Sequence, residues 1–289
     1  MTKTKVLIFH TGYEDYLKFN CEITSKKNEI VIIGDESVSN LSKINNVEFV
    51  NYEKYINDEK IKYLKSYFKP YNTVDEKYVW LWYLRIFITK LFMDDYKVSK
   101  IFHIDSDNIL LENINDFIFE KDNAYLVNND FGNPFAMTAS IHSSLLRNDF
   151  FNQFIKLYED IFINKTKFKL IEEKIKFHEE NGGGGICDMT LFYLLEKLNL
   201  IKVQNLMLPV KTRSNNEFIF MNNLNNPLGY DSRYQYKKSY KGIVKIYKEK
   251  NEFTIFDSTK NKHVNIANVH FQGKAKKYLN KKALQKYLT

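Results

Sequence analysis

The chain has 289 residues, of which 44% are hydrophobic, and its 43 basic against 35 acidic side chains give a net charge of +8. This size and hydrophobic content can bury a substantial core, so we expect one α/β domain with small additions. No run approaches the ~18 apolar residues of a membrane-spanning helix, and the apolar part of MTKTKVLIF is too short for a signal peptide. Two cysteines, Cys21 and Cys187, imply no disulfide framework and suit a reducing cytoplasm.

The first half of the chain alternates strand and helix patterns. We predict strands at 5–9, 29–34, 47–50 and 98–104, and helices at 53–68 and 74–93. This order is typical of βαβ units and predicts a mostly parallel sheet. The helix 74–93 contains Arg85, one of only four arginines. Because a buried unpaired guanidinium is costly, we expect Arg85 to be paired with an anion.

The second half is less regular. We predict strands at 124–128 and 135–141, helices at 150–163, 168–180 and 189–198, a hairpin of 242–247 and 252–256 with its turn at 248–251, and a third partner strand at 264–269.

The most informative local pattern is a pair of carboxylates after an apolar run. Residues 97–111, KVSKIFHIDSDNILL, place Asp105 and Asp107 at the end of the run 101–104. That run reads as a buried strand, and open α/β sheets bind ligands at the carboxyl ends of their strands. Mg²⁺ and Mn²⁺ are commonly shared between one or two carboxylates and substrate phosphates. The pair predicts half of a metal-diphosphate site, although two aspartates here could instead cap a following helix.

A second set of candidate ligands lies near the carboxyl end. Residues 264–278, VNIANVHFQGKAKKY, read as an apolar strand ending in His270, followed by Gly273 and Lys276. Imidazole suits manganese, a glycine lets backbone approach a phosphate, and a lysine can meet diphosphate charge. Taken alone, a histidine such as His270 is more often a structural residue than a ligand. We interpret the other five histidines as structural, with His10 also a binding candidate: His10, His103, His142, His178 and His263.

The strand-Asp-x-Asp pattern together with the late His-x-x-Gly-x-x-Lys resembles the metal-dependent GT-A glycosyltransferases, especially those like glycosyltransferase family 8. The resemblance implies a Rossmann-like, mostly parallel sheet flanked by helices, with a small carboxyl-terminal hairpin and helix addition. It also implies that Asp105, Asp107 and His270 hold Mn²⁺ or Mg²⁺ on a nucleotide-sugar, while Lys276 contacts the diphosphate.

The same resemblance assigns further contacts to the nucleotide-sugar. The segment HTGY after the first strand would face the base, and Tyr83-Leu84-Arg85 resembles the arginine-bearing helix that precedes Asp-x-Asp in these enzymes. The expected nucleotide-sugar contacts are His10, Thr11, Gly12, Tyr13, Arg85, Asp105, Ser106, Gly273 and Lys276. We accordingly divide the single domain into a nucleotide-binding half at 1–130, an acceptor and donor-sugar half at 131–273, and a basic tail at 274–289.

Four consecutive glycines precede Asp188 in the segment NGGGGICD. Such a run predicts a loop that either bends sharply or lets a ligand touch backbone. No Lys-Ser or Lys-Thr follows, so it is not a phosphate-binding P-loop. Asp188 begins a helical pattern and could be its N-cap. The resemblance implies instead that Asp188 faces the sugar, and we name Asp188 and Lys276 as candidate catalytic residues.

These assignments predict a metal-dependent hexosyltransferase that moves a hexose from a UDP-sugar to a surface glycan or glycolipid, and the resemblance implies retention of configuration. A metal ion and Lys276 would stabilise the charge that develops on the diphosphate. A nucleotidyltransferase is the first alternative, but His10-Thr11-Gly12-Tyr13-Glu14 is not the glycine-rich basic signature it would need. A basic nucleic-acid-binding protein is the second, yet the lysines are spread along the chain without a binding motif, so we expect no nucleic-acid partner.

The last sixteen residues, KAKKYLNKKALQKYLT, hold six lysines and no acidic residue. Their aromatic and leucine side chains, including Tyr278 and Leu279, could gather on one side of a helix. We therefore predict a peripheral contact with an anionic membrane, on its inner face, through residues 274–289. A solvated helix packed on the domain is the alternative.

Overall fold

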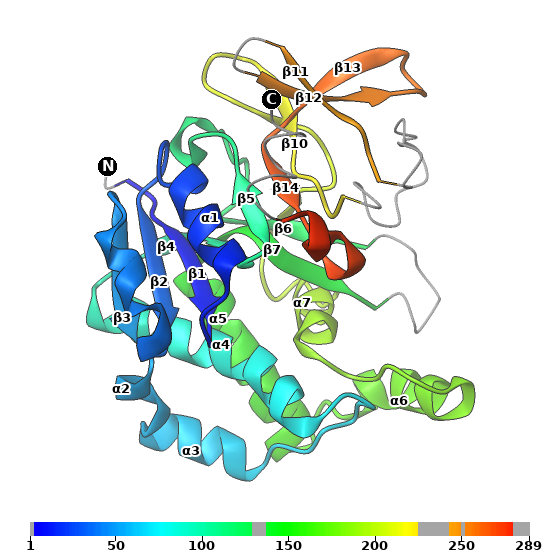
Figure 1. Ribbon diagram of the computed structural model, residues 1–289. Coiled ribbons are helices and arrows are strands. Elements are labelled where there is room, and N and C mark those ends of the chain that lie inside the picture. The colour runs from blue at the N-terminus through cyan, green and yellow to red at the C-terminus, as the bar shows by residue number, and fades with distance from the viewer. Residues whose placement is uncertain (1–2, 129–136, 225–242, 250–251, 280–289) are drawn as a thin grey trace.

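A seven-stranded sheet, in the order β3-β2-β1-β4-β7-β6-β8, runs through the computed structural model, which describes residues 3–128, 137–224, 243–249 and 252–279 (Figure 1). The strands are β1 (Val6–His10), β2 (Ile30–Gly34), β3 (Val47–Asn51), β4 (Lys100–Ile104), β6 (Asn123–Val127), β7 (Ala139–Arg147) and β8 (Val203–Asn205). Only β7 runs antiparallel to its neighbours in this sheet. The predicted α/β class, with a mostly parallel sheet flanked by helices, is confirmed.

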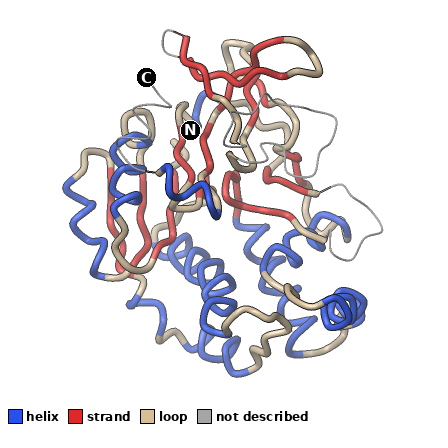
Figure 2. Tube along the Cα trace, turned by 45° about the vertical axis from the view of Figure 1, so that its right-hand side comes forward, coloured by secondary structure: helices blue, strands red, loops and turns tan. Residues whose placement is uncertain are grey.

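Alternate side chains of the strands pack into two separate hydrophobic cores. Leu7, Val31 and Ile33 point to one face, and Val6 and Ile8 point to the other. Because successive side chains in a strand point to opposite faces, these apolar strands must be covered on both sides. Both faces are covered by helices, and Figure 2 shows most of the helices gathered below the strands.

The helices on the two faces differ in number and size. Helix α1 (Asp15–Thr24) packs on one face, while the other carries α3 (Glu59–Ser66), α4 (Glu76–Asp95), α5 (Asn148–Tyr158), α6 (Lys169–Asn181) and α7 (Asp188–Lys197). Helix α5 continues as a π-helical turn over Glu159–Ile163, and shorter 3₁₀ turns span Glu36–Lys43 and Ile114–Asp116. The aromatic side chains Tyr83, Phe87, Phe154 and Tyr158 pack edge to face where α4 meets α5.

The predicted helix 53–68 is wrong as one element. It is two helices, α2 (Glu53–Ile56) and α3, because the Asp58 side chain accepts a hydrogen bond from the Lys60 amide at 2.8 Å and starts a new helix. The other predicted helices correspond to α4, α5 with its π turn, α6 and α7, with ends shifted by a few residues.

A second, five-stranded sheet lies at the top of Figure 1, in the order β11-β12-β13-β10-β9. Its strands are β9 (Val210–Lys211), β10 (Glu217–Ile219), β11 (Ile246–Glu249), β12 (Glu252–Asp257) and β13 (Lys262–Ile266). The predicted hairpin is confirmed as antiparallel β11 and β12, although part of its turn, 250–251, lies outside the described residues. Strands β8, β9 and β10 were not predicted, since two or three residues carry too little pattern.

The predicted strand 264–269 is in fact two strands with different partners. Strand β13 pairs with β12, while β14 (Asn268–His270) leaves that sheet and pairs antiparallel with β5 (Asn108–Leu110). The ribbon of β5 and β14 joins the small sheet to the central one, and it positions the site described below.

The carboxyl-terminal segment departs from the amphipathic helix expected of it. Residues 273–278 form a 3₁₀ turn (Gly273–Tyr278), and Ala275 and Leu279 are buried in the core beneath the small sheet. Leu279 therefore does not contribute to a membrane-facing side, and the rest of the predicted tail, 280–289, lies outside the described residues. Within the described part of the chain, no helix combines the length and apolar character needed to cross a bilayer.

Candidate active site

The antiparallel ribbon brings the two distant motifs together. In its register His270 lies opposite Asn108, and the Phe271 amide donates to the carbonyl of Asp107 at 2.9 Å. Because β5 follows the Asp-x-Asp turn directly, this pairing places the late histidine beside both aspartates. Sequence positions about 160 residues apart thus form one site at the carboxyl end of β4.

Asp105, Asp107 and His270 form a candidate cation site. One ligand atom from each lies within 4.8 Å of the others, and His270 Nε2 is 3.3 Å from Asp107 Oδ1. Asp107 and His270 are buried, whereas Asp105 is partly open. Two carboxylates and one imidazole are a donor set that a divalent cation can use.

Neighbouring charges oppose the effect of burial on the pKa of Asp107 and of His270. Burial alone would raise the pKa of Asp107, but its hydrogen bond to His270 and the charge of Lys276 lower that pKa instead. Burial alone would lower the pKa of His270, but Asp107 raises it. A metal ion requires the neutral imidazole, so a cation at this site would compete with the proton that Asp107 favours on His270.

Buried asparagines fix the Asp-x-Asp turn, and the sequence reasoning missed them. Asn20 on α1 donates to the carbonyls of Ser106 and Asn108, at 2.9 Å each. Asn268 donates to Asn108 Oδ1 at 2.7 Å, which ties the two strands of the ribbon together. Buried amides that are fully hydrogen-bonded hold one geometry because the alternatives leave polar groups unpaired. The only sequence signal for them was an asparagine inside an apolar pattern.

His142 also belongs to this neighbourhood, although it was interpreted only as a structural residue. Its ring stacks on His270 with centroids 4.2 Å apart, and its Nδ1 lies 2.7 Å from Ser140 Oγ. The other ring nitrogen of His270, Nδ1, contacts the carbonyl of Asn222. The His270 ring is therefore held on three sides. His103, His178 and His263 hydrogen-bond to Ile141, Gly183 and Thr254, and none of them is among the candidate cation ligands.

Arg85 is paired with an anion, as predicted, and in fact with two. Its Nη1 donates to Asp105 at 3.0 Å and its Nη2 to Asp188 at 2.6 Å. The guanidinium thus links the first metal ligand to the start of α7. Burial would raise the pKa of Asp105, and the Arg85 charge outweighs it and lowers that pKa.

Asp188 is the first residue of α7, and Cys187 occupies the N-cap position. Its carboxylate accepts from the Met189 amide at 2.8 Å as well as from Arg85. Burial raises the pKa of Asp188 against the opposing charge of Arg85. Asp188 therefore lies one position after the N-cap, and the prediction of Asp188 as the N-cap residue is off by one. Arg85 links the Asp188 side chain to Asp105.

Lys276 lies on the open side of the cluster. Its Nζ is 3.2 Å from Asp107 Oδ2, and its side chain is 48% exposed. Gly273 begins the turn that carries Lys276 and has a φ of +59°, which favours glycine. The lysine therefore places a positive charge against a metal ligand while still reaching solvent.

The segment after β1 lies next to the same site. Strands β1 and β4 are parallel with Ile8 opposite Ile104, so His10 lies level with the Asp-x-Asp turn. Burial lowers the pKa of His10, and Lys276 adds to this effect. Gly12 donates to Asp35 Oδ2 at 2.6 Å, a contact the sequence did not indicate. Thr11 and Tyr13 follow on the same segment, and Tyr13 is 40% exposed.

The glycine run is required by the chain's own backbone. A Cβ on Gly185 would lie 2.1 Å from the Tyr71 carbonyl oxygen, and one on Gly184 would lie 2.6 Å from the His178 ring. The Thr73 amide donates to the Gly184 carbonyl at 3.0 Å, which closes the loop onto the start of α4. The sequence predicted a loop that either bends sharply or lets a ligand touch its backbone. At Gly184 and Gly185, the atoms that approach closely belong to the protein itself.

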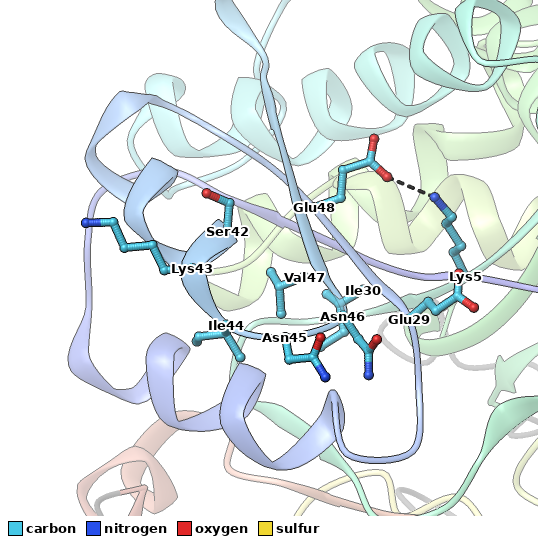
Figure 3. A pocket seen from close by; sticks show the side chains of 10 residues that line it. All are labelled: Lys5, Glu29, Ile30, Ser42, Lys43, Ile44, Asn45, Asn46, Val47 and Glu48. Atoms are coloured by element: carbon cyan, nitrogen blue, oxygen red, sulfur yellow. Dashed lines mark hydrogen bonds and ion pairs between the residues drawn. The ribbon is translucent and has the colours of Figure 1, made fainter.

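Two cavities lie at opposite ends of the central sheet. One of 530 Å³ sits at the amino ends of β1, β2 and β3, where Lys5 and Glu48 form an ion pair at 2.8 Å (Figure 3). A smaller one of 180 Å³ adjoins His142 and Gln272 beside the candidate cation site. Ligands of open α/β sheets bind at the carboxyl ends of the strands, which favours the second cavity.

Solved structures similar to this chain include enzymes of two transferase classes. The PaToxG glycosyltransferase is 13% identical over 68% of this chain and 70% of its own, with a TM-score of 0.41. The apo-form glycosyltransferase GlyE of Streptococcus pneumoniae TIGR4 is 13% identical over 71% of this chain and 46% of its own, with a TM-score of 0.34. A cytidylyltransferase from Leptospira borgpetersenii is 9% identical over 71% of this chain and 99% of its own, with a TM-score of 0.33.

The match to GlyE covers less than half of the length of the GlyE chain. No family model matches the chain, and no curated protein matches it. With TM-scores of 0.41 and below, the likeness does not decide between transfer of a sugar and transfer of a nucleotide.

Proposed function

We propose that this protein is a metal-dependent glycosyltransferase that moves a hexose from a UDP-sugar to a surface glycan or glycolipid, with retention of configuration. The observation that carries the proposal is the convergence of Asp105, Asp107 and His270 within 4.8 Å, at the carboxyl end of a buried parallel strand. Two cationic side chains contact these carboxylates: Arg85 lies 3.0 Å from Asp105, and Lys276 lies 3.2 Å from Asp107.

The donor set supports a divalent cation bound by Asp105, Asp107 and His270. When bound, such an ion would neutralise negative charge on a diphosphate. Lys276 can reach the same phosphates, because its side chain is about half exposed and its ammonium group lies beside Asp107. A positive charge aimed at the leaving diphosphate favours breakage of the bond between it and the anomeric carbon.

Asp188 and Arg85 are the groups that we assign to the sugar. The Arg85 guanidinium fixes the Asp188 carboxylate at the start of α7, where the helix dipole also favours a negative charge. A fixed carboxylate stabilises the positive charge that develops on the sugar ring in an oxocarbenium-like state. His10 lies level with the Asp-x-Asp turn and Thr11, Gly12 and Tyr13 follow it in the chain, and we assign these four residues to the nucleotide.

Calorimetry of UDP with and without Mn²⁺ tests the proposal. UDP affinity should increase strongly with Mn²⁺ in the parent protein, and Asp107→Ala should lose that metal dependence. Incubation with UDP-glucose or UDP-galactose and Mn²⁺ should release UDP slowly even without an acceptor, since water can replace it. Equal metal dependence in Asp107→Ala would refute the metal assignment.

The same samples distinguish a glycosyltransferase from a nucleotidyltransferase, which is the nearest alternative. A nucleotidyltransferase would release pyrophosphate from a nucleoside triphosphate and a sugar phosphate, and it would not hydrolyse UDP-sugars. Pyrophosphate release without UDP-sugar hydrolysis would therefore overturn the proposal while leaving the metal site intact.

A further inference from the structure

The 180 Å³ cavity is built by the immediate neighbours of the candidate catalytic residues. Met189 follows Asp188 in the chain, Gln272 lies two residues after His270, and His142 stacks on the His270 ring. At ~30 Å³ for each water, the cavity has room for about six water molecules or for one sugar ring. It is close enough to the site to hold a second substrate.

The two nitrogens of His270 mark two sides of the site. Nε2 faces Asp107, which is also the side of Lys276, and Nδ1 faces the carbonyl of Asn222, which lines the cavity. The diphosphate of a donor must lie with the cations and the metal ligands, on the Nε2 side. The cavity on the Nδ1 side is thus left for the other substrate.

Among the residues that the structure describes, the lining of this cavity includes no aspartate, glutamate, lysine or arginine, although 27% of the chain is charged. Its polar side chains are amides and hydroxyls, with His142 beside them: Asn128, Thr138, Ser140, Asn222, Asn223 and Gln272. By contrast, the 530 Å³ cavity includes Lys5, Lys43, Glu29 and Glu48. Among the described residues, the two cavities thus differ in charge, and the one beside the site is lined by uncharged side chains and His142.

Neutral amides and hydroxyls suit a polyhydroxylated ligand. Each amide offers two donors and an acceptor, and each hydroxyl both donates and accepts, which matches the hydroxyl groups of a sugar. A carboxylate or phosphate placed here would lose water without meeting a cation, which is unfavourable. Met189 and Met207 add flexible apolar contacts that fit the C–H faces of a sugar ring.

We infer that this cavity is the acceptor pocket and that it takes an uncharged sugar residue, with Asn222 and Gln272 as specificity-determining contacts. The inference rests on the proposed glycosyltransferase function and adds the chemical class of the acceptor. Two hydrogen bonds connect residues of its lining: the Asn128 backbone amide donates to the Thr138 carbonyl at 3.1 Å, and Asn223 Nδ2 lies 3.5 Å from Gln272 Oε1. A uronic acid or a sugar phosphate is excluded as the residue bound in it.

Ligand-detected NMR on the full chain with Mn²⁺ and UDP tests this directly. The probes are the methyl glycosides of glucose, galactose and mannose, compared with glucuronic acid and glucose 6-phosphate. We expect at least one neutral glycoside to bind, and both charged sugars to bind at least tenfold more weakly. Binding of a charged sugar as tight as the best neutral one, or no binding of any neutral glycoside, would overturn the inference.

Variants assign the binding to this pocket. Asn222→Ala combined with Gln272→Ala removes two side-chain amides but keeps the backbone carbonyl that contacts His270. At about 1 kcal/mol for each hydrogen bond, glycoside affinity should fall about thirtyfold. Asn45→Ala removes an exposed amide from the cavity of Figure 3 and should leave glycoside affinity unchanged. The two single variants serve the same purpose if the double variant unfolds. Parent-like affinity in a folded double variant refutes the assignment.

Failure of the inference and failure of the proposed function give different results. UDP calorimetry on the same samples reports the donor side, and the double variant should keep UDP affinity within about threefold, since neither amide lies on the Nε2 side of His270. Absence of Mn²⁺-dependent UDP binding in the parent would refute the proposed function. Normal UDP binding without glycoside binding would refute only the acceptor pocket.

Discussion

Replacing Lys276 by methionine should have opposite effects on metal binding and on nucleotide binding. Without nucleotide, the ammonium group lies 3.2 Å from Asp107 Oδ2 and competes with a cation for that carboxylate. Methionine keeps much of the side-chain length and removes the charge. Metal affinity without nucleotide should therefore increase, while UDP affinity in the presence of metal should decrease because a phosphate contact is lost.

The magnitude follows from the distance and the exposure. Because the Lys276 side chain is 48% exposed, a dielectric close to that of water applies. At that dielectric, two unit charges 3.2 Å apart interact by about 1.3 kcal/mol, which corresponds to about ninefold in affinity. Measured exposed pairs contribute about 0.2–1 kcal/mol, which gives a lower range of about 1.4- to fivefold. The loss on the nucleotide side is larger, about ten- to a hundredfold, since a hydrogen bond to a charged group contributes about 1.5–3 kcal/mol.

Isothermal titration calorimetry measures both effects, with Mn²⁺ titrated alone and UDP titrated at saturating Mn²⁺. Lys5→Met is the matched control, since Lys5 forms an ion pair of 2.8 Å with Glu48 and is 42% exposed, at the opposite end of the sheet. That control should change neither affinity. If Lys276→Met binds Mn²⁺ no more tightly than the parent without nucleotide, the competition between lysine and metal is refuted.

Three further changes test other parts of the molecule. Asp188→Asn should lower UDP-sugar turnover by about a hundredfold or more and leave UDP affinity nearly unchanged, as for a group needed in the transition state; unchanged initial rates would leave Asp188 as a helix-start residue only. Gly185→Ala should lower the free energy of unfolding in urea by about 2 kcal/mol or more, because its Cβ would meet the Tyr71 carbonyl. Gly182→Ala is the control: its Cβ would have nothing within 4 Å, so it should cost only about 1 kcal/mol, from its φ of +68°. Equal losses in the two variants would contradict the packing argument. Truncation after Leu279 should weaken co-sedimentation with anionic vesicles at low salt, at about 1 kcal/mol for each lysine removed from the surface, and equal sedimentation of both forms would remove the membrane role.

Local pattern was sufficient wherever a residue's role depends on its own element. The apolar runs predicted β1, β2, β3, β4 and β6, because a strand buried on both faces reads as a continuous hydrophobic segment. The same reasoning placed Asp105 and Asp107 at a strand end. An anionic partner for Arg85 was also predictable, because burying an unpaired guanidinium is costly whichever residue is its partner.

Only the tertiary structure decided which distant groups meet. The pairing of β5 with β14 brings His270 to Asp107, and three-residue strands carry no periodic signal. Hydrogen bonds from Asn20 and Asn268 hold that turn, and an asparagine's burial depends on elements that pack over it from elsewhere in the chain. The approach of Tyr71 to Gly185 and the burial of Leu279 are likewise contacts between segments, whereas the break at Asp58 is a local helix cap. Periodicity along a chain reports which face of an element is buried, whereas the partner that buries it is set by packing in three dimensions.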